Sequence, residues 1–466
     1  MKGKTIKLVI FALVSLACVA LGWFIAPLEG LDPGGMRFLA IFIWWVVMLV
    51  LELTPLHITS LIACVLCIAT GVPDAGAIVF SQLGSPTVLL MLGAFGLAAA
   101  LAASGLLKRI ALRVVRLAPK TGLAQLLSFE AAAALITPWI PAAVGKQAIL
   151  VPLGEQIAGQ LGFKPHGRAR TSFFLIVLFF TIPVGACFLT GYASVATALA
   201  FIPYEISWVG WLRGSAVYLV TLIVLLTAFI VFYFRSSKED AVDDIDADAI
   251  TRAVDEQLAQ MGRMSKKEWF SLAVMVGAVA LFLMGDQIGV PAYIVALGAW
   301  LLLAVGNLFT TQDFMVKLNW PILIFIGTTL GLIGLLQATG VAAWIASLTA
   351  PMLAPFMSNP FLFVAALVIL VYLLRFAMVG PTVITALAAA MFASSGVDPF
   401  VYVFVILVSG IVFLLYYQNP TVVAAMGLTG GNVVQKDITT GAVAFMVANL
   451  AALLISVPYW MVLGMI

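Results

Sequence analysis

The chain has 466 residues, of which 64% are hydrophobic and 9% are charged, and its formal net charge is +3. A soluble globular protein carries about 25% charged residues, so this composition excludes that class. The small net charge gives no reason to expect nucleic acid as a partner.

Long apolar segments predict an all-α polytopic membrane protein. Runs of about 17 to 25 apolar residues suit spanning helices and lack the strict alternation of a transmembrane β-barrel strand. The first segment follows several lysines but is too long for a signal peptide, so it counts as a helix. About eleven helices are expected, the first ending near residue 26 and the others at 37–53, 56–72, 84–107, 171–203, 209–234, 269–285, 289–308, 320–345, 400–427 and 439–464.

The hydrophobic segment 122–160 cannot form one continuous helix. Pro138 and Pro141 each remove a backbone donor and clash with the preceding turn. Broken backbone at membrane depth is tolerated only where protein or a wet cavity surrounds it, because hydrocarbon offers no hydrogen bonds. The break is therefore a candidate site. The residues at its tip are Pro141, Ala142 and Ala143.

Basic residues cluster on both sides of this segment, in loops at 108–120 and 164–170. By the positive-inside rule both loops are cytoplasmic, so the segment is predicted to enter and leave the membrane on one face, as a re-entrant hairpin. The polar segment 235–268 is interpreted as a cytoplasmic linker with a short surface helix near 249–262. The helix count then places the amino terminus inside the cell, in a bacterial-type inner membrane, and the carboxyl terminus outside.

The linker separates two halves, 1–234 and 269–466. Aligning Pro86 with Pro321 without a gap also pairs Gly105 with Gly340. The first half contains three scaffold helices and an even number of helices in all, so the second half is predicted to be inverted. Its own broken stretch, 359–392, contains Gly380, Pro381 and Thr382. Paired interruptions in inverted halves indicate the binding site of a secondary transporter.

The expected helices 171–203 and 400–427 are interrupted by polar residues at corresponding places. The first contains Tyr192 and Ser194, and the second contains the run Gln418-Asn419-Pro420-Thr421. Amide groups inside an apolar helix need partners, and the proline frees a carbonyl group. These residues either face a substrate or form a satisfied interhelical hydrogen-bond cluster.

The Glu52-Leu-Thr-Pro-Leu segment after Trp45, the glycine-rich helix 84–107, the two hairpins and the two interrupted helices resemble the divalent-anion sodium symporter family. Members of that family carry dicarboxylates, citrate or sulfate. The resemblance covers nearly the whole chain. It implies a homodimer of eleven-helix subunits, each with a scaffold and an elevator-like transport domain that binds substrate between the hairpin tips and the interrupted helices.

The chain departs from this family where sodium and substrate would bind. The family places Ser-Asn-Thr at each hairpin tip, whereas this chain has Pro-Ala-Ala at 141–143 and Gly-Pro-Thr at 380–382. Where the family has Thr-Pro-Pro-Asn, this chain has Tyr192-Ala193-Ser194-Val195. Only Thr382 and Pro420 match clearly. A hard cation such as Na⁺ needs several oxygen ligands, so these losses argue against a conventional sodium site.

Two basic residues lie close to the breaks. Lys146 either takes the place of the missing cation, attracting an anion and exchanging a proton in a poorly hydrated environment, or has a structural role. In the structural role it extends to the membrane surface or pairs with Glu130 or Glu155. Arg375, five residues before the second break, has the same two interpretations, and its fork suits a carboxylate or sulfonate group.

The sequence therefore predicts a secondary active transporter of small organic anions such as di- or tricarboxylates, which is proton-coupled or exchanging rather than classically Na⁺-coupled. A Na⁺-coupled symporter of dicarboxylate, sulfate or sulfonate is the alternative, and an ion channel or ion antiporter is a weaker one. The lipid bilayer is the other expected partner. Neither enzymatic activity nor a cofactor or resident metal is expected, because no catalytic constellation or nucleotide motif is present. The expected binding residues are Pro141, Ala142, Ala143, Lys146, Tyr192, Ser194, Gly380, Pro381, Thr382, Thr385, Gln418, Asn419 and Thr421, with Arg375 as a further candidate.

Overall fold

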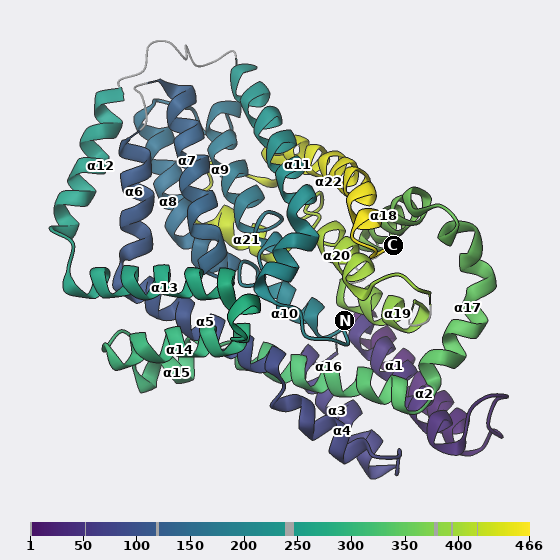
Figure 1. The fold of residues 1–466 in the computed structure, drawn as a ribbon. Coiled ribbons are helices and arrows are strands. Elements are labelled where there is room, and N and C mark those ends of the chain that lie inside the picture. The colour runs from purple at the N-terminus through teal and green to yellow at the C-terminus, as the bar shows by residue number, and fades with distance from the viewer. Residues whose placement is uncertain are drawn as a thin grey trace.

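The computed structural model describes residues 2–51, 53–117, 121–237, 247–376, 381–392, 395–416 and 418–466. Within these ranges the regular elements are helices, without a strand, which confirms the predicted all-α class (Figure 1). In this described part, eight helical segments are long and apolar enough to cross a membrane, and five shorter apolar helices accompany them. The protein is therefore a multi-pass membrane protein, while the count of eleven spans stays a prediction.

The elements before the linker run from α1 to α11 and include two short 3₁₀ turns. They are α1 Lys2–Trp23, α2 Pro33–Leu51, α3 Leu56–Ala69, α4 Ala75–Leu83, α5 Pro86–Ser104, α6 Leu106–Arg116, α7 Gly122–Ile136, η1 Thr137–Trp139, α8 Ala143–Gln160, α9 Arg168–Thr181, η2 Gly185–Cys187, α10 Ala193–Leu199 and α11 Trp208–Arg235.

The linker helix and the second half supply the remaining elements. They are α12 Ala247–Met261, α13 Lys266–Ile288, α14 Ala292–Val305, α15 Thr311–Val316, α16 Trp320–Ala338, α17 Val341–Met357, α18 Pro360–Phe376, α19 Pro381–Met391, α20 Pro399–Ser409, α21 Pro420–Gly427 and α22 Gln435–Val462. The linker helix α12 matches the short helix expected near 249–262.

Four helices lie wholly or largely outside the expected ranges, namely α4, α6, α15 and α17. Helix α6 corrects the expectation that residues 108–120 form a loop. Its apolar residues, including Leu107, Ala111 and Val115, recur at helical spacing and are buried, and most of its basic residues face outward. The segment was expected to be a loop because arginine and lysine are frequent in it, although its apolar residues follow an amphipathic pattern.

The gapless alignment of the two halves corresponds to matched local structure. Pro86 and Pro321 lie in the first turns of α5 and α16, and each helix has a side-chain cap at its start. Each helix is followed by a glycine in the left-handed region, Gly105 at φ +79° and Gly340 at φ +73°. A residue with a Cβ adopts this conformation only with strain, so these glycines mark the ends of both helices.

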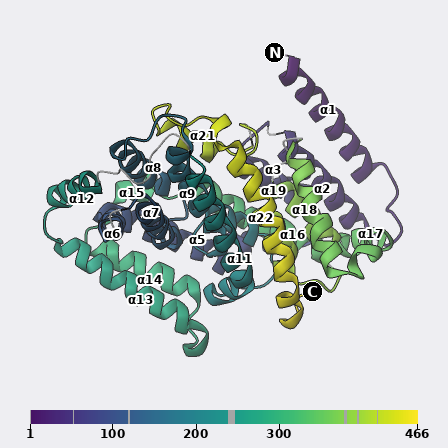
Figure 2. The same ribbon diagram turned by 90° about the horizontal axis from the view of Figure 1, so that it is seen from above.

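The two halves interleave instead of forming separate bodies. In Figure 1, α6, α7, α8, α9 and α11 stand side by side, and α13 and α14 run across one end of this bundle. Helix α5 packs against α14, and α4 packs against α16. A Cβ added to Gly96 of α5 would lie 2.3 Å from the Trp300 ring of α14, so this close crossing requires glycine. Figure 2 shows α1 extending away from the other helices.

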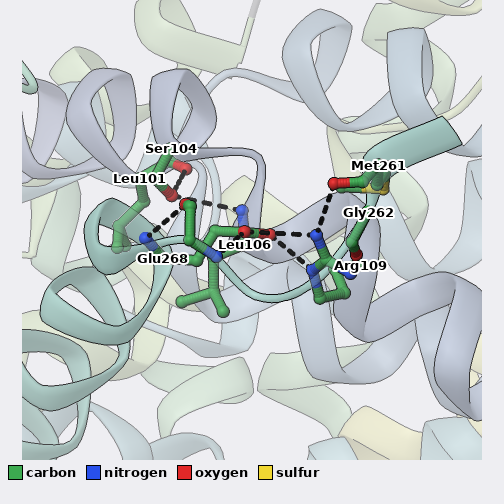
Figure 3. Close-up of polar contacts among 8 residues, drawn as sticks. Leu101, Ser104, Leu106, Arg109, Met261, Gly262 and Glu268 are labelled. Atoms are coloured by element: carbon green, nitrogen blue, oxygen red, sulfur yellow. Dashed lines mark hydrogen bonds and ion pairs between the residues drawn. The ribbon is translucent and has the colours of Figure 1, made fainter. Parts of the chain in front are cut away.

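A buried ion pair ties α6 to the start of the second half (Figure 3). The Nε atom of Arg109 lies 2.5 Å from a carboxylate oxygen of Glu268, and the guanidinium also donates to the carbonyl groups of Met261 and Gly262. Glu268 completes a capping box with Ser265 at the start of α13. Loss of one partner would leave an uncompensated buried charge, which typically costs about 3 to 5 kcal/mol. The linker is thus anchored at its second end.

Candidate functional site

The first hairpin breaks between α7 and α8, at Pro138 and Pro141. The Thr190 hydroxyl donates to the Pro138 carbonyl at 2.9 Å. The Ala193 N–H donates to the Pro141 carbonyl at 2.8 Å. Thr190 lies in the interruption between α9 and α10, and Ala193 is the first residue of α10. This segment therefore satisfies backbone groups that lipid could not satisfy.

Lys146 lies near the start of α8 and is fully buried, with 0% of its surface exposed. Its Nζ atom donates to the Gly191 carbonyl at 2.6 Å, which is its single hydrogen bond in the described part of the chain. A Cβ added to Gly185 would lie 3.0 Å from the same nitrogen. The ammonium group therefore lies inside the α9–α10 interruption, against backbone atoms.

The two carboxylates considered as partners of Lys146 contact other residues. Glu155 lies 2.7 Å from Arg170, and Glu130 accepts a hydrogen bond from Thr227. The complete burial of Lys146 also excludes a side chain that extends to the membrane surface. The geometry thus favours the interpretation in which the ammonium takes the place of a bound cation.

The second half places a cation in the same relation to its own interrupted helix. Arg375, in the last turn of α18, is 8% exposed, and its guanidinium donates to the Gln418 carbonyl between α20 and α21. The Gln418 side chain accepts from the Leu415 N–H at 2.9 Å. The Asn419 Oδ1 atom accepts from the N–H and the hydroxyl of Thr421 at 3.2 Å and 2.6 Å. The amide oxygens of Gln418 and Asn419 therefore bond locally, to residues two or three positions away in the same segment.

Tyr192 connects the two halves. Its side chain is 8% exposed, and it interacts with the Ser194 side chain and with the charge of Arg375. Gly191, which accepts the hydrogen bond from Lys146, directly precedes Tyr192. Lys146 therefore contacts the α9–α10 interruption directly, and Arg375, which donates to Gln418, lies within electrostatic reach of it. Among the predicted site residues, the structure pairs Tyr192 with Ser194 and Arg375 with Gln418, and it places Lys146 on Gly191, the residue before Tyr192.

The other predicted residues lie in two places, at the start of α8 and at or just before α19. Pro141 and Ala142 precede α8, which begins at Ala143 without a side-chain cap, so its first amide groups face the break. Thr382 and Thr385 lie on α19, and Thr382 forms no described hydrogen bond to either cation. Pro381 begins that helix, and Gly380 lies outside the described residues.

The sequence analysis did not identify the backbone groups that hold Lys146. Gly185 and Gly191 approach so closely that a Cβ on Gly191 would lie 2.5 Å from the Gly185 carbonyl oxygen. Two glycines, Gly185 and Gly191, within one apolar segment were the available signal. Such spacing indicates close backbone approach, which places carbonyl groups where a cation can reach them.

In each half a buried basic side chain donates to the carbonyl group of an interrupted helix, and paired interruptions of this kind are typical of secondary transporters. A comparison with protein families agrees. The chain belongs to the family described as the sodium:sulfate symporter transmembrane region, whose model matches residues 5–466. The predicted resemblance to the divalent-anion sodium symporters is thereby confirmed.

Curated relatives are transporters or inner membrane proteins. Dicarboxylate transporter 1 of Arabidopsis thaliana chloroplasts is 27% identical over 343 residues, which are 71% of this chain and 60% of that protein. YbhI, an Escherichia coli inner membrane protein, is 28% identical over 350 residues, 72% of this chain and 71% of that protein. The putative malate transporter YflS of Bacillus subtilis is 24% identical over 357 residues, 74% of this chain and 72% of that protein. The chain spans 50 to 60% of the length of the chloroplast relatives.

Two solved transporters share the fold. The YdaH transporter of Alcanivorax borkumensis superposes with a TM-score of 0.56 at 14% identity, covering 82% of this chain and 86% of that one. MtrF of Neisseria gonorrhoeae superposes with a TM-score of 0.57 at 12% identity, covering 95% of this chain and 97% of that one. At these identities the likeness concerns the fold alone.

Proposed function

We propose that the chain transports small organic dianions such as dicarboxylates, and that a Na⁺ gradient does not drive this transport. The observation that carries the proposal is the repeated placement of a buried cation on the carbonyl of an interrupted helix. Lys146 reaches Gly191 in the first half, and Arg375 reaches Gln418 in the second. The names of two relatives, a dicarboxylate transporter and a putative malate transporter, support the substrate class.

The ammonium of Lys146 competes directly with a sodium ion. Na⁺ needs several oxygen ligands, and the first tip offers backbone carbonyl groups but no hydroxyl or amide side chain at residues 141–143. A Na⁺ ion about 4 Å from the ammonium would face a repulsion of about 4 kcal/mol at an effective dielectric constant near 20. The backbone carbonyl groups around Gly191 are therefore not expected to hold Na⁺ and the Lys146 ammonium group together.

Two buried cations suit a substrate with two negative charges. Lys146 contacts Gly191, Arg375 lies within electrostatic reach of Tyr192, and the uncapped start of α8 adds amide groups that favour an anion. A dicarboxylate that met both basic side chains would place each of its carboxylates beside one of them. The Arg375 guanidinium can also hold a carboxylate through two parallel hydrogen bonds.

The proposal includes an elevator-type movement in a homodimer, embedded in a bacterial-type inner membrane. The family membership and the E. coli inner membrane relative support this arrangement. The amino terminus, the linker and residues 164–170 are proposed to face the cytoplasm, because basic residues favour that side. Labelling of Lys164→Cys by an impermeant thiol reagent in intact cells should be weak, and strong labelling would contradict the orientation.

The decisive experiment is uptake of labelled malate or succinate into proteoliposomes under separate gradients of Na⁺, H⁺ and counter-substrate. Uptake is expected to follow the counter-substrate or proton gradient and to be unaffected by Na⁺. The alternative, a Na⁺-coupled symporter of dicarboxylate, sulfate or sulfonate, takes support from the printed family description. Steep, saturable stimulation by Na⁺ at constant pH and membrane potential would establish it instead.

A further inference from the structure

Gln147 is a fully buried side chain that the site described above does not use. It follows Lys146 in α8 and is 0% exposed. Its Nε2 atom donates to the Thr181 hydroxyl group at 3.3 Å, whereas its Oε1 atom is buried without a hydrogen-bond partner among the described residues. Buried polar atoms are nearly always hydrogen-bonded, so this oxygen needs an explanation.

Thr181 determines which way the Gln147 amide group is oriented. Thr181 is the last residue of α9, and its hydroxyl group donates to the Val177 carbonyl at 2.6 Å. A hydroxyl group has one hydrogen to donate, so the Thr181 oxygen accepts from Gln147. The reversed amide group would place two acceptors against each other. Oε1 is therefore the amide atom that lacks a partner.

Other donors at this end of α9 are already in use. The Thr137 hydroxyl group donates to the Phe180 carbonyl at 2.9 Å. The N–H groups of Ile182 and Val184 donate to carbonyl groups of α9. In the part of the chain that the structure describes, no donor is left for Gln147 Oε1, so it is an acceptor that a ligand can use.

Gln147 lies beside the proposed binding site. Lys146 contacts Gly191 at one end of the α9–α10 interruption, and Gln147 contacts Thr181 at the other end. Side chains of an α-helix tilt toward its amino terminus, so the Gln147 amide group is directed toward the break at Pro141. Two successive residues of α8 thus contact both ends of the interruption.

The second interruption lacks an equivalent unpaired acceptor among its described amide groups. The Gln418 side-chain oxygen accepts from the Leu415 N–H at 2.9 Å, and the Asn419 side-chain oxygen accepts from Thr421. Among these amide side chains, only that of Gln147 keeps an oxygen without a donor in the described structure. This asymmetry suits a ligand that brings a hydrogen-bond donor to the first interruption.

An unpaired amide oxygen discriminates between dicarboxylates. Fully ionised succinate offers only acceptors, so Gln147 Oε1 cannot form a hydrogen bond with it. A hydroxyl group on carbon 2, as in malate, supplies a donor and leaves both negative charges in place. We propose that Gln147 accepts a hydrogen bond from the 2-hydroxyl group of a hydroxydicarboxylate, an inference that rests on the proposed function. Thr181 is a positioning residue that orients the Gln147 amide group.

Competition in malate counterflow tests this proposal, with the full-length protein in proteoliposomes. The competitors are unlabelled malate, succinate and methylsuccinate, which carries a methyl group where malate carries the hydroxyl group. In the wild type, malate should inhibit at about tenfold lower concentration than succinate, since one hydrogen bond to a buried, otherwise unpaired acceptor is gained. Methylsuccinate should inhibit more weakly than succinate, because its methyl group would meet the amide oxygen. Equal inhibition by malate and succinate would overturn the proposal.

Gln147→Met keeps a side chain of similar length and removes the acceptor. We expect the preference for malate over succinate to disappear, mainly through weaker inhibition by malate. The matched control is Gln156→Met, since Gln156 is a glutamine of the same helix that is bonded to Gln257, and it should keep the wild-type preference. A preference in Gln147→Met that stays within about threefold of the wild-type value would contradict the assignment.

Thr181→Val provides a second test in case Gln147→Met does not fold. It removes the hydroxyl group that orients the amide group, so the preference for malate should fall, and Thr181→Ser should restore it. An unchanged preference in Thr181→Val would overturn the proposed orientation. Because the preference is a ratio measured in one preparation, a smaller amount of folded protein does not change it.

Failure of the proposed function gives a different result. It would show in the wild type as an absence of malate counterflow, or as counterflow that requires Na⁺. Failure of the inference about Gln147 would instead show as active counterflow that does not distinguish malate from succinate.

Discussion

The two interrupted helices hold different cations, and the difference suggests different tasks. Lys146 is a compact ammonium, 0% exposed, with one hydrogen bond to Gly191. Arg375 is a planar fork that reaches Gln418 and also lies within electrostatic reach of Tyr192. An ammonium acts as a point charge, whereas a guanidinium imposes direction on a carboxylate. We therefore expect Lys146 to supply compensating charge to a bound dianion, and Arg375 to orient it as well.

Among the variants that test this comparison, those that remove Lys146 should show the largest loss of malate affinity. Lys146→Ala is expected to weaken malate binding by about 3 kcal/mol, because a buried charge pair loses one partner. Lys146→Gln keeps a donor for the Gly191 carbonyl without the charge, so it should lose a similar amount if charge is the essential property. Isothermal titration calorimetry of the purified protein measures both variants.

The exposed lysine Lys164 provides the matched control, since Lys164→Ala should leave malate affinity unchanged. Normal affinity in Lys146→Gln would show that the hydrogen bond matters and the charge does not. Saturable Na⁺ stimulation in the wild type, retained in Lys146→Ala, would contradict the assignment of the ammonium to the cation position.

Adding a methyl group beside the Gly191 carbonyl group should have the next largest effect on malate binding. In Gly185→Ala the added Cβ would lie 2.7 Å from the Gly191 carbonyl oxygen and 3.0 Å from the Lys146 ammonium nitrogen. We expect about 2 kcal/mol of destabilisation, together with weaker malate binding, because close-packed backbone must shift. Thermal unfolding and calorimetry measure the two effects. Gly277→Ala is the control, since no heavy atom lies within 4 Å of its added Cβ, and equal melting of both variants would refute the close approach.

The sequence predicted where the helices break better than it predicted which residues form hydrogen bonds across the breaks. Pro138 and Pro141 locate the first break because proline acts on its own helix, which local sequence records. The hydrogen bond from Lys146 to Gly191 joins residues 45 positions apart, so it depends on how α8 docks against α9 and α10. Periodicity carries no information on such docking, and for this reason the sequence left Glu130 and Glu155 as equally plausible partners of Lys146.

Replacing Arg375 with lysine keeps the positive charge but removes the planar guanidinium group. This exchange therefore tests orientation separately from charge. Arg375→Lys should weaken malate binding by roughly tenfold, because a lysine cannot form two parallel hydrogen bonds with one carboxylate. Competition assays with mono- and dicarboxylates measure whether discrimination between them also falls. Arg375→Gln, which removes the charge, should lose more affinity than Arg375→Lys. Equal losses would assign Arg375 the same charge-compensating task as Lys146.

The smallest effect is expected at Asn419, where the sequence left two interpretations open. The side chain is 7% exposed and caps α21 through hydrogen bonds to Thr421. Asn419→Ala should therefore cost about 1 kcal/mol of stability, the usual loss of an amino-terminal cap, with only a small change in malate affinity. Asn419→Ser, which can still cap, should restore the melting temperature. If Asn419→Ala instead abolishes malate binding at an unchanged melting temperature, the residue contacts substrate, and the second interruption would bind the dianion through side chains as well as through Arg375.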